Sequence, residues 1–213
     1  MNIYALNKIF VEGESDKRFI DFLLNTFYEI IDADLVIDVK GKDKLKDNPL
    51  LIDERRKSEG AKNLIIFDTD FDNSTSKGGR EKRLEEYKKI GKDLSVDFRI
   101  FLLPFNDESD GILENLINTC FKKEFDFFDG CWSGMIDCIK TEKIENLNIP
   151  AQKAFVFSKI DLFRDNRILE KWDYKSSSKY EYLDSGIWNF DRENNKKLNK
   201  LLEFIENNLF ENE

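Results

Sequence analysis

Short apolar runs alternate with longer segments of helical periodicity along the first half of the chain. The apolar runs predict strands at residues 3–11, 34–39, 63–67 and 96–103. Between them, apolar residues at helical spacing predict helices at residues 14–31, 47–58 and 80–93. Strands separated by helices of this length are typical of a mainly parallel sheet with crossover helices, so we predict an α/β fold with helices flanking the sheet.

The pattern changes after Pro104, where the chain becomes mostly helical. Helical segments are predicted at residues 111–121, 123–147, 150–172 and 194–209, with an aromatic-rich loop at 174–190. The sequence contains no internal repeat and no obvious linker. We therefore expect an α/β core over residues 1–118 and a mostly helical extension over residues 119–213 that packs on this core.

Composition restricts the classes of function. A hydrophobic content of 40% and an aromatic content of 13% argue against disorder. With 34 basic and 43 acidic residues the net charge is −9, so any contact with nucleic acid must come from a local basic patch. Three cysteines without a CxxC pair fit a reduced protein with no zinc site. The absence of a signal-peptide pattern and of a long apolar run predicts a cytoplasmic protein without a membrane partner.

The chain contains no histidine. This absence excludes Ser-His-Asp and Cys-His catalysis, histidine metal sites, and nucleases that use histidine as a base. Acid–base or metal chemistry must therefore use carboxylates, lysine, tyrosine or metal-bound water.

The stretch IFVEGESD places acidic residues directly after the first predicted strand. Glu12 leaves the strand, Gly13 lets the backbone approach other groups closely, and Asp16 falls in the first turn of the next helix. In an open parallel sheet, ligands bind at the carboxyl ends of the strands, which is where we expect Glu12. The alternative is that Ser15 or Asp16 simply caps the helix.

A second acidic stretch, IIFDTDFD, follows the third predicted strand. Alternation along an extended chain puts Asp68 and Asp70, followed by Asp72, on one side. Right-handed crossovers bring this strand end to the same edge as Glu12. Clustered carboxylates repel one another unless cations bridge them, and Mg²⁺ binds one or two carboxylates together with water and phosphate. We therefore predict a site for Mg²⁺ or Mn²⁺, with a simple turn role for Asp72 as the alternative.

Together, IFVEGESD and IIFDTDFD resemble the TOPRIM domain, which primases, topoisomerases and OLD-type nucleases share. That family has a conserved glutamate after its first strand, matched by Glu12, and a DxD after its third, matched by Asp68 and Asp70. The stretch VKGKDKL is similar to the second TOPRIM strand with its following glycine, here Gly41. The resemblance covers about residues 5–118, and later segments are similar to an uncharacterised bacterial TOPRIM-like family.

The resemblance implies that Glu12 is a general acid/base or a metal ligand and that Asp68 and Asp70 bind Mg²⁺. The chain departs from OLD-type nucleases in having no clear SxG stretch unless SDG at 109–111 stands in for it, in which case Glu114 would match a further metal ligand. Asp110 and Glu114 lie four residues apart at a predicted helix start, so they share a face, and a simple helix-start role is the alternative.

Two basic segments flank the predicted site. KGKDKLK follows the second strand and includes Lys40 and Lys42. KGGREKRLEEYKKIGK follows the DxD loop and includes Lys77, Arg80 and Arg83. Such segments can contact a phosphate backbone, with strong salt dependence, whereas the alternative is a solvated helix face.

These observations favour a metal-dependent phosphodiester-cleaving enzyme that acts on DNA or RNA. A role in nucleic-acid maintenance or phage defence is implied by the resemblance alone. A second hypothesis is a non-catalytic TOPRIM-like module that binds metal or nucleotide and works with a partner protein. A third is a haloacid-dehalogenase-like phosphatase, in which Asp68 attacks phosphate and Asp70 acts as acid/base. That class also needs a downstream Ser/Thr at a strand end and a lysine, which the stretch FSK at 157–159 imitates, and a second acidic pair, which does not follow.

Overall fold

The computed structural model describes residues 6–71, 78–142, 147–163, 182 and 186–210. The chain divides into two compact units, Met1–Leu113 with Lys196–Glu213 and Glu114–Asn195. The sequence predicts the boundary at residue 118 and the C-terminal helix as part of the extension. The structure places this helix in the first unit, because its leucine-rich stripe is buried there.

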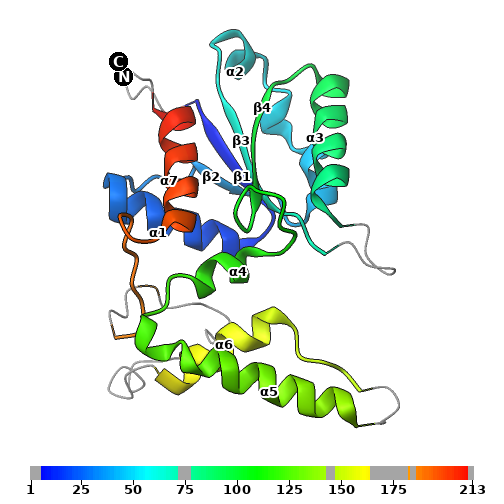
Figure 1. The fold of residues 1–213 in the computed structure, drawn as a ribbon. Helices are drawn as coiled ribbons and strands as arrows, with labels where there is room; N and C mark the ends of the chain where they lie inside the picture. The colour runs from blue at the N-terminus through cyan, green and yellow to red at the C-terminus, as the bar shows by residue number, and fades with distance from the viewer. Residues whose placement is uncertain (1–5, 72–77, 143–146, 164–181, 183–185, 211–213) are drawn as a thin grey trace. The chain divides into compact units, whose positions relative to one another are not determined.

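A four-stranded sheet forms the centre of the first unit (Figure 1). Its strands are β1 (Lys8–Val11), β2 (Val36–Asp38), β3 (Asn63–Asp68) and β4 (Phe98–Leu103), in the spatial order β2-β1-β3-β4. All three pairings between neighbouring strands are parallel. β1 is buried along its whole length and β3 along almost all of it, as expected for central strands covered on both faces. The predicted fold class, an α/β protein with a mainly parallel sheet flanked by helices, is confirmed.

Two helices cover one face of the sheet, α1 (Glu14–Tyr28) and α7 (Lys196–Leu209), drawn in blue and red in Figure 1. They contact each other through the Tyr28 hydroxyl, which donates a hydrogen bond to the carbonyl oxygen of Leu202 at 3.2 Å. The apolar residues of α7 recur every three or four positions, so they form one buried stripe: Leu198, Leu201, Leu202, Ile205 and Leu209. The helix that follows the first strand, α1, and the C-terminal helix, α7, are thereby packed on the same face of the sheet.

The opposite face is covered by α3 (Arg80–Leu94). A core of buried side chains joins this helix and the loops after β2 to the sheet: Phe10, Val39, Leu45, Leu51, Ile65, Phe67, Tyr87 and Leu102. The rings of Phe67 and Tyr87 meet edge-on with their centroids 5.5 Å apart. This contact fixes α3 against the end of β3, where the DxD motif begins.

The helical segment expected near residues 47–58 is divided into short helices. Three short helices occupy this region: η1 (Lys42–Asp47), η2 (Pro49–Leu51) and α2 (Glu54–Ser58). Pro49 has no backbone N–H and cannot continue a preceding helix, so the chain turns there. The side chain of Asp53 then starts α2 by accepting a hydrogen bond from the backbone N–H of Arg56 at 2.9 Å.

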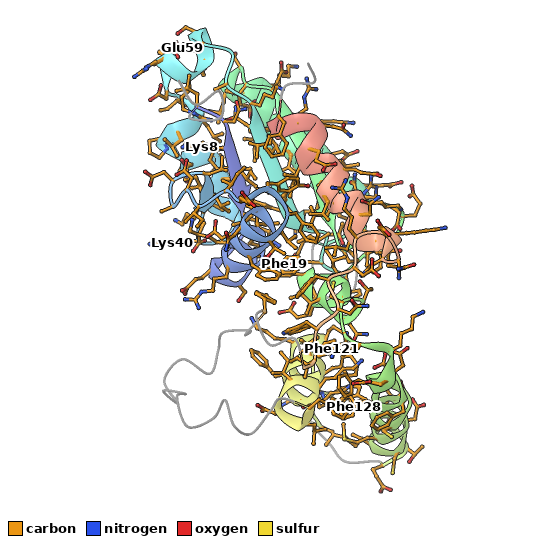
Figure 2. The ribbon with its side chains drawn as sticks, turned by 90° about the vertical axis from the view of Figure 1, so that its left-hand side faces the viewer. Lys8, Phe19, Lys40, Glu59, Phe121 and Phe128 are labelled. Atoms are coloured by element: carbon orange, nitrogen blue, oxygen red, sulfur yellow. The ribbon has the colours of Figure 1, made fainter. Side chains whose placement is uncertain are left out.

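The second unit is helical over most of its described residues. Its elements are most of α4 (Leu113–Asn118), η3 (Lys123–Phe125), α5 (Phe127–Thr141) and α6 (Gln152–Phe163). Phe128 lies between α5 and α6 in Figure 2, with its ring stacked 5.7 Å from that of Phe155. Most of the predicted aromatic loop at 174–190 lies outside the described residues. Within the described ranges, no helix has the length and apolar character needed to cross a membrane.

Candidate functional site

The two acidic motifs leave neighbouring strands at one edge of the sheet. The parallel register of β1 and β3 pairs Val11 with Ile66, two residues before the end of β3. Glu12 therefore follows β1 at the level where β3 approaches Asp68. Because both strands run in the same direction, their carboxyl ends form one rim, the place where open parallel sheets bind ligands.

The Glu12 carboxylate is placed in an unfavourable electrostatic environment. Burial is the main cause of its raised pKa, and the negative charge of Asp70 raises the pKa further. The charges of Lys42 and Arg83, and a hydrogen bond from the Lys42 backbone N–H, lower the pKa without cancelling these effects. The second carboxylate oxygen, Oε2, is buried and has no hydrogen-bond partner among the described residues. A buried carboxylate oxygen without a donor is costly unless a ligand or a proton satisfies it.

Gly13 and Asp16 shape the start of α1. The Asp16 carboxylate accepts a hydrogen bond from the Gly13 backbone N–H at 2.9 Å, as in a capping box. Gly13 has extended backbone angles that any residue adopts, with φ −149° and ψ 179°. The capping alternative raised for Asp16 from the sequence thus describes this contact.

Asp70 carries the densest set of polar contacts at the edge. Its backbone is left-handed, with φ 56°, a conformation that aspartate tolerates better than most residues. Its N–H donates a hydrogen bond to the carbonyl oxygen of Gly111 at 3.0 Å. Its Oδ2 accepts one hydrogen bond from Lys42 Nζ at 3.0 Å and one from the Arg83 guanidinium at 2.6 Å. Lys42 and Arg83, which the sequence suggested as phosphate contacts, are therefore the cations that neutralise Asp70 here.

Gly78 was not among the predicted site residues, yet its close approach to Asp70 requires a glycine. A Cβ at position 78 would lie 2.7 Å from the carbonyl oxygen of Phe71 and 2.8 Å from the Cβ of Asp70. Both distances are shorter than atoms tolerate, so only glycine fits against Asp70. The Gly78-Gly79 pair shortly after the DxD motif is the sequence signal that could have located this close approach.

Asp68 and Thr69 hold the loop that follows β4. The Asp68 Oδ1 accepts a hydrogen bond from the backbone N–H of Leu113, the first residue of α4, at 2.8 Å. Thr69 is fully buried, and its hydroxyl donates to the carbonyl oxygen of Leu103 at 2.9 Å and accepts from the Gly111 N–H at 2.7 Å. Thr69 was also missed from the sequence, where the only signal is a hydroxyl between two aspartates. The DxD motif thus carries a structural role in addition to any ligand role.

The loop after β2 is fixed beside Glu12. The Gly41 N–H donates a hydrogen bond to the Glu12 carbonyl oxygen at 2.8 Å, and Gly41 has φ 105°, which favours glycine. Lys40, labelled in Figure 2, is exposed, and its backbone N–H donates to Asp38 Oδ1 at 2.7 Å. Gly41 therefore positions the loop that brings Lys42 to Asp70, while Lys40 presents its charge to solvent.

The remaining predicted residues have other contacts. Asp110 Oδ1 accepts a hydrogen bond from the backbone N–H of Arg80, the first residue of α3, at 2.9 Å, so it serves a helix start different from the one expected. Glu114 belongs to the second unit, where it is 5% exposed and forms an ion pair with Lys153 at 3.8 Å. Asp72 and Lys77 lie outside the described residues.

Of the expected carboxylates, the described residues couple Glu12 with Asp70, and Asp72 lies outside them. Among the described residues, no group of three or more aspartate, glutamate or cysteine side chains is arranged to hold a metal ion. Glu12 and Asp70 are electrostatically coupled, whereas Asp68 holds Leu113. Two carboxylates suffice for Mg²⁺ when water and phosphate complete the shell, and the unpartnered Oε2 of Glu12 fits a cation. Such an ion would compete with Lys42 and Arg83 for Asp70, whose Oδ2 both of them contact.

The fold and this edge define an α/β protein with a candidate ligand site at the carboxyl end of a parallel sheet. The chain belongs to the family described as protein of unknown function DUF3226, whose model matches residues 6–207. Neither a curated protein nor a solved structure matches the chain. Family membership therefore adds no activity to what the residues indicate.

Proposed function

We propose that this protein is a metal-dependent phosphodiester-cleaving enzyme that acts on DNA or RNA. The observation that carries the proposal is the buried Glu12 Oε2, which lacks a hydrogen-bond partner among the described residues and lies in the field of Asp70. Both carboxylates belong to the motifs that resemble TOPRIM domains. A site that buries an unsatisfied carboxylate at the carboxyl edge of a parallel sheet is suited to a divalent cation.

Glu12 and Asp70 would hold Mg²⁺ or Mn²⁺, with Asp68 close by on the same rim. When bound, a divalent cation supplies Lewis-acid activation of a phosphodiester. In the alternative role, with the cation held by Asp70 instead, the raised pKa of Glu12 would suit a general acid or base. Lys42 and Arg83 would contact the phosphate once the cation has taken their place on Asp70, since a planar guanidinium matches phosphate geometry.

The basic surface around this edge gives the nucleic acid a place to bind. Lys40 is exposed after β2 and Arg80 is half-buried at the start of α3, whereas Arg83 is buried against Asp70. Affinity that depends on such charges falls steeply with salt.

The three cysteines, Cys120, Cys131 and Cys138, are free, which supports the proposed cytoplasmic location. A role in nucleic-acid maintenance or phage defence completes the proposal.

The test is cleavage of plasmid, single-stranded DNA and tRNA with Mg²⁺ or Mn²⁺. The variants are Glu12→Gln and Asp70→Asn, with Glu59→Gln as the matched control. Glu59 is an exposed carboxylate whose partner is Arg55, at the other end of the sheet. We expect cleavage by the wild type and by Glu59→Gln, and a loss on the order of 100-fold in each site variant, because a catalytic cation contributes several kcal/mol. Cleavage that survives in both site variants would contradict the proposal.

A non-catalytic module that binds metal or nucleotide and works with a partner protein is the second candidate. The observation that favours it is the double neutralisation of Asp70 by Lys42 and Arg83. Calorimetric binding of Mn²⁺ or nucleotide that disappears in Glu12→Gln, without cleavage of any substrate, would select this candidate.

The phosphatase alternative has weaker support. Ser158 and Lys159 lie within α6, not at a strand end. Lys159 is fully buried and paired with Asp129 at 2.7 Å. A phosphoenzyme formed on Asp68 would be needed to revive it.

A further inference from the structure

Three buried polar atoms near the candidate site lack a hydrogen-bond partner among the described residues: Glu12 Oε2, Arg83 Nε and the Tyr87 hydroxyl. Native proteins leave few such atoms, and a group of them in one place calls for an explanation. Glu12 is already part of the candidate site, and Arg83 pairs with Asp70. Tyr87 was not singled out by the sequence.

The three residues act on one another. Arg83 and Tyr87 are four residues apart on α3, so they share one face of the helix, and they are 3% and 0% exposed. The charges of Arg83, Glu86, Glu12 and Asp70 all influence the Tyr87 hydroxyl, and those of Asp70 and Arg83 influence Glu12. The Tyr87 ring is held against Phe67, the residue just before Asp68. The Tyr87 side chain is therefore held near the end of β3, where the charges of Glu12 and Asp70 act on its hydroxyl.

Their hydrogen-bonding chemistry is complementary. Burial raises the pKa of Tyr87, so its hydroxyl keeps the proton and acts as a donor. The Arg83 Nε–H is also a donor, and Glu12 Oε2 is an acceptor. No direct hydrogen bond joins these atoms in the described part of the chain, and one small polar molecule could satisfy all three. A buried water typically makes about three hydrogen bonds, which is the number of partners this cluster offers.

We propose that Tyr87 is a positioning residue for Glu12: its hydroxyl and the Arg83 Nε–H bind one buried water molecule that also contacts Glu12 Oε2. This bridge fixes the Glu12 carboxylate beside Asp70. Its consequence for cation binding rests on the proposed function, whereas the link between Tyr87 and Glu12 does not. Outer contacts of this kind orient a ligand side chain without touching the ligand.

The link is tested by a double-mutant cycle on the metal-free protein, with unfolding measured by denaturant in EDTA. The changes are Tyr87→Phe, which removes only the hydroxyl, and Glu12→Met, which removes the charged acceptor at similar length. We expect Tyr87→Phe to raise the unfolding equilibrium constant about tenfold in the wild type. In the Glu12→Met background, the factor by which Tyr87→Phe raises the unfolding equilibrium constant should be at least about threefold smaller, as for residues that share a network.

Tyr28→Phe is the matched control, because its hydroxyl contacts Leu202 on the other face of the sheet. Its effect should be additive with Glu12→Met. Additivity of Tyr87→Phe with Glu12→Met, to within about twofold in the equilibrium constant, would overturn the proposal.

Calorimetry with Mn²⁺ alone separates positioning from general stability. We expect Tyr87→Phe to weaken Mn²⁺ binding by the folded protein about tenfold, the scale seen for outer contacts of metal ligands. Replacement of Tyr87 by 4-aminophenylalanine, which retains a donor at the same position, should restore most of this affinity. Unchanged affinity in Tyr87→Phe would overturn the positioning role. If the wild type binds no Mn²⁺, the proposed metal site is wrong, and the double-mutant cycle still decides whether Tyr87 and Glu12 are linked.

Discussion

Two buried arginines lie at opposite ends of the same sheet, and their surroundings differ. Arg56 lies near the amino ends of β1 and β3 and is 5% exposed. Its Nε donates a hydrogen bond to the Leu6 carbonyl oxygen at 2.9 Å, and its Nη2 donates to Asn63 Oδ1 at 2.8 Å. Its Nη1 donates to the Leu50 carbonyl oxygen. Arg83, at the carboxyl edge, is 3% exposed and pairs with Asp70 and Glu86, while its Nε has no partner among the described residues.

The difference distinguishes an arginine with a structural role, Arg56, from an arginine that belongs to the candidate ligand site, Arg83. Arg56 joins neutral backbone and amide oxygens, and each of its three nitrogens donates a hydrogen bond, so its role is structural. Arg83 is paired with carboxylates that an incoming cation could also use, and it lies beside the unsatisfied Glu12. Satisfied networks rigidify a fold, whereas unsatisfied groups at a strand-end rim indicate a ligand.

The largest effect that distinguishes the two ends is on stability. We expect Arg56→Met to lower the free energy of unfolding by about 3 kcal/mol, because it leaves buried carbonyl and amide oxygens without donors. Arg83→Met should cost only about 1 kcal/mol, because water can replace the arginine at partly exposed carboxylates. The side chains of Asp70 and Glu86 are 32% and 35% exposed. Denaturant unfolding in EDTA measures both changes. Equal losses of unfolding free energy in the two variants would contradict the proposed difference between the two arginines.

A smaller effect is expected for Lys42→Met, which should raise the affinity for Mn²⁺ and lower the affinity for nucleic acid. Without the competing ammonium on Asp70, Mn²⁺ should bind roughly threefold more tightly, since the Coulomb energy of a partly exposed pair is modest. Nucleic-acid binding should weaken, with a salt slope about one unit shallower. Calorimetry and salt-dependent titrations measure these quantities.

The matched control for this change is Lys40→Met, at an exposed neighbouring lysine that forms no ion pair with Asp70 among the described residues. It should reduce the salt slope and leave Mn²⁺ affinity unchanged. Weaker Mn²⁺ binding in Lys42→Met would mean that the lysine does not compete with the cation.

The smallest expected effect is a change of pH profile. The pKa of Glu12 in the folded protein is raised above its ordinary value of 4.5. Between these two values the folded state binds more protons than the unfolded state, so this group makes the free energy of unfolding fall as pH rises through that window. Glu12→Gln removes this contribution. Its advantage over the wild type in EDTA should therefore grow above pH 4.5 and level off above the folded-state pKa.

Denaturant titrations from about pH 4 to about pH 8 measure this difference. Glu59→Gln should give a profile parallel to that of the wild type. A Glu12→Gln profile that is also parallel would show that burial does not raise the pKa of Glu12.

The sheet and the rim of the site followed from the sequence because both depend on local patterns. Apolar runs at 63–67 and 96–103 are long enough to specify buried strands, and β3 and β4 cover them closely. Parallel strands end at one edge, so Glu12 and the DxD motif were bound to lie on it. The helical segment near 47–58 is divided into short helices, one of which begins at Pro49, a detail that apolar spacing does not predict.

The partners of each carboxylate could not be predicted in the same way. The pairing of Asp70 with Arg83 depends on how α3 packs, which the Phe67–Tyr87 contact decides. The turn of Asp68 toward Leu113 depends on the path of the loop after β4. Such contacts join residues 13 and 45 positions apart, beyond the range of periodicity. Tyr87 escaped notice for the same reason, since its helix was interpreted as a solvated basic face.

The most direct test of the central claim is the anomalous diffraction of Mn²⁺ in crystals of the wild-type protein. We predict one or more peaks within coordination distance of the Glu12 and Asp70 carboxylates, with Lys42 displaced from Asp70. No peak at this edge at saturating Mn²⁺, with both ion pairs to Asp70 retained, would contradict the claim that this rim is a metal site.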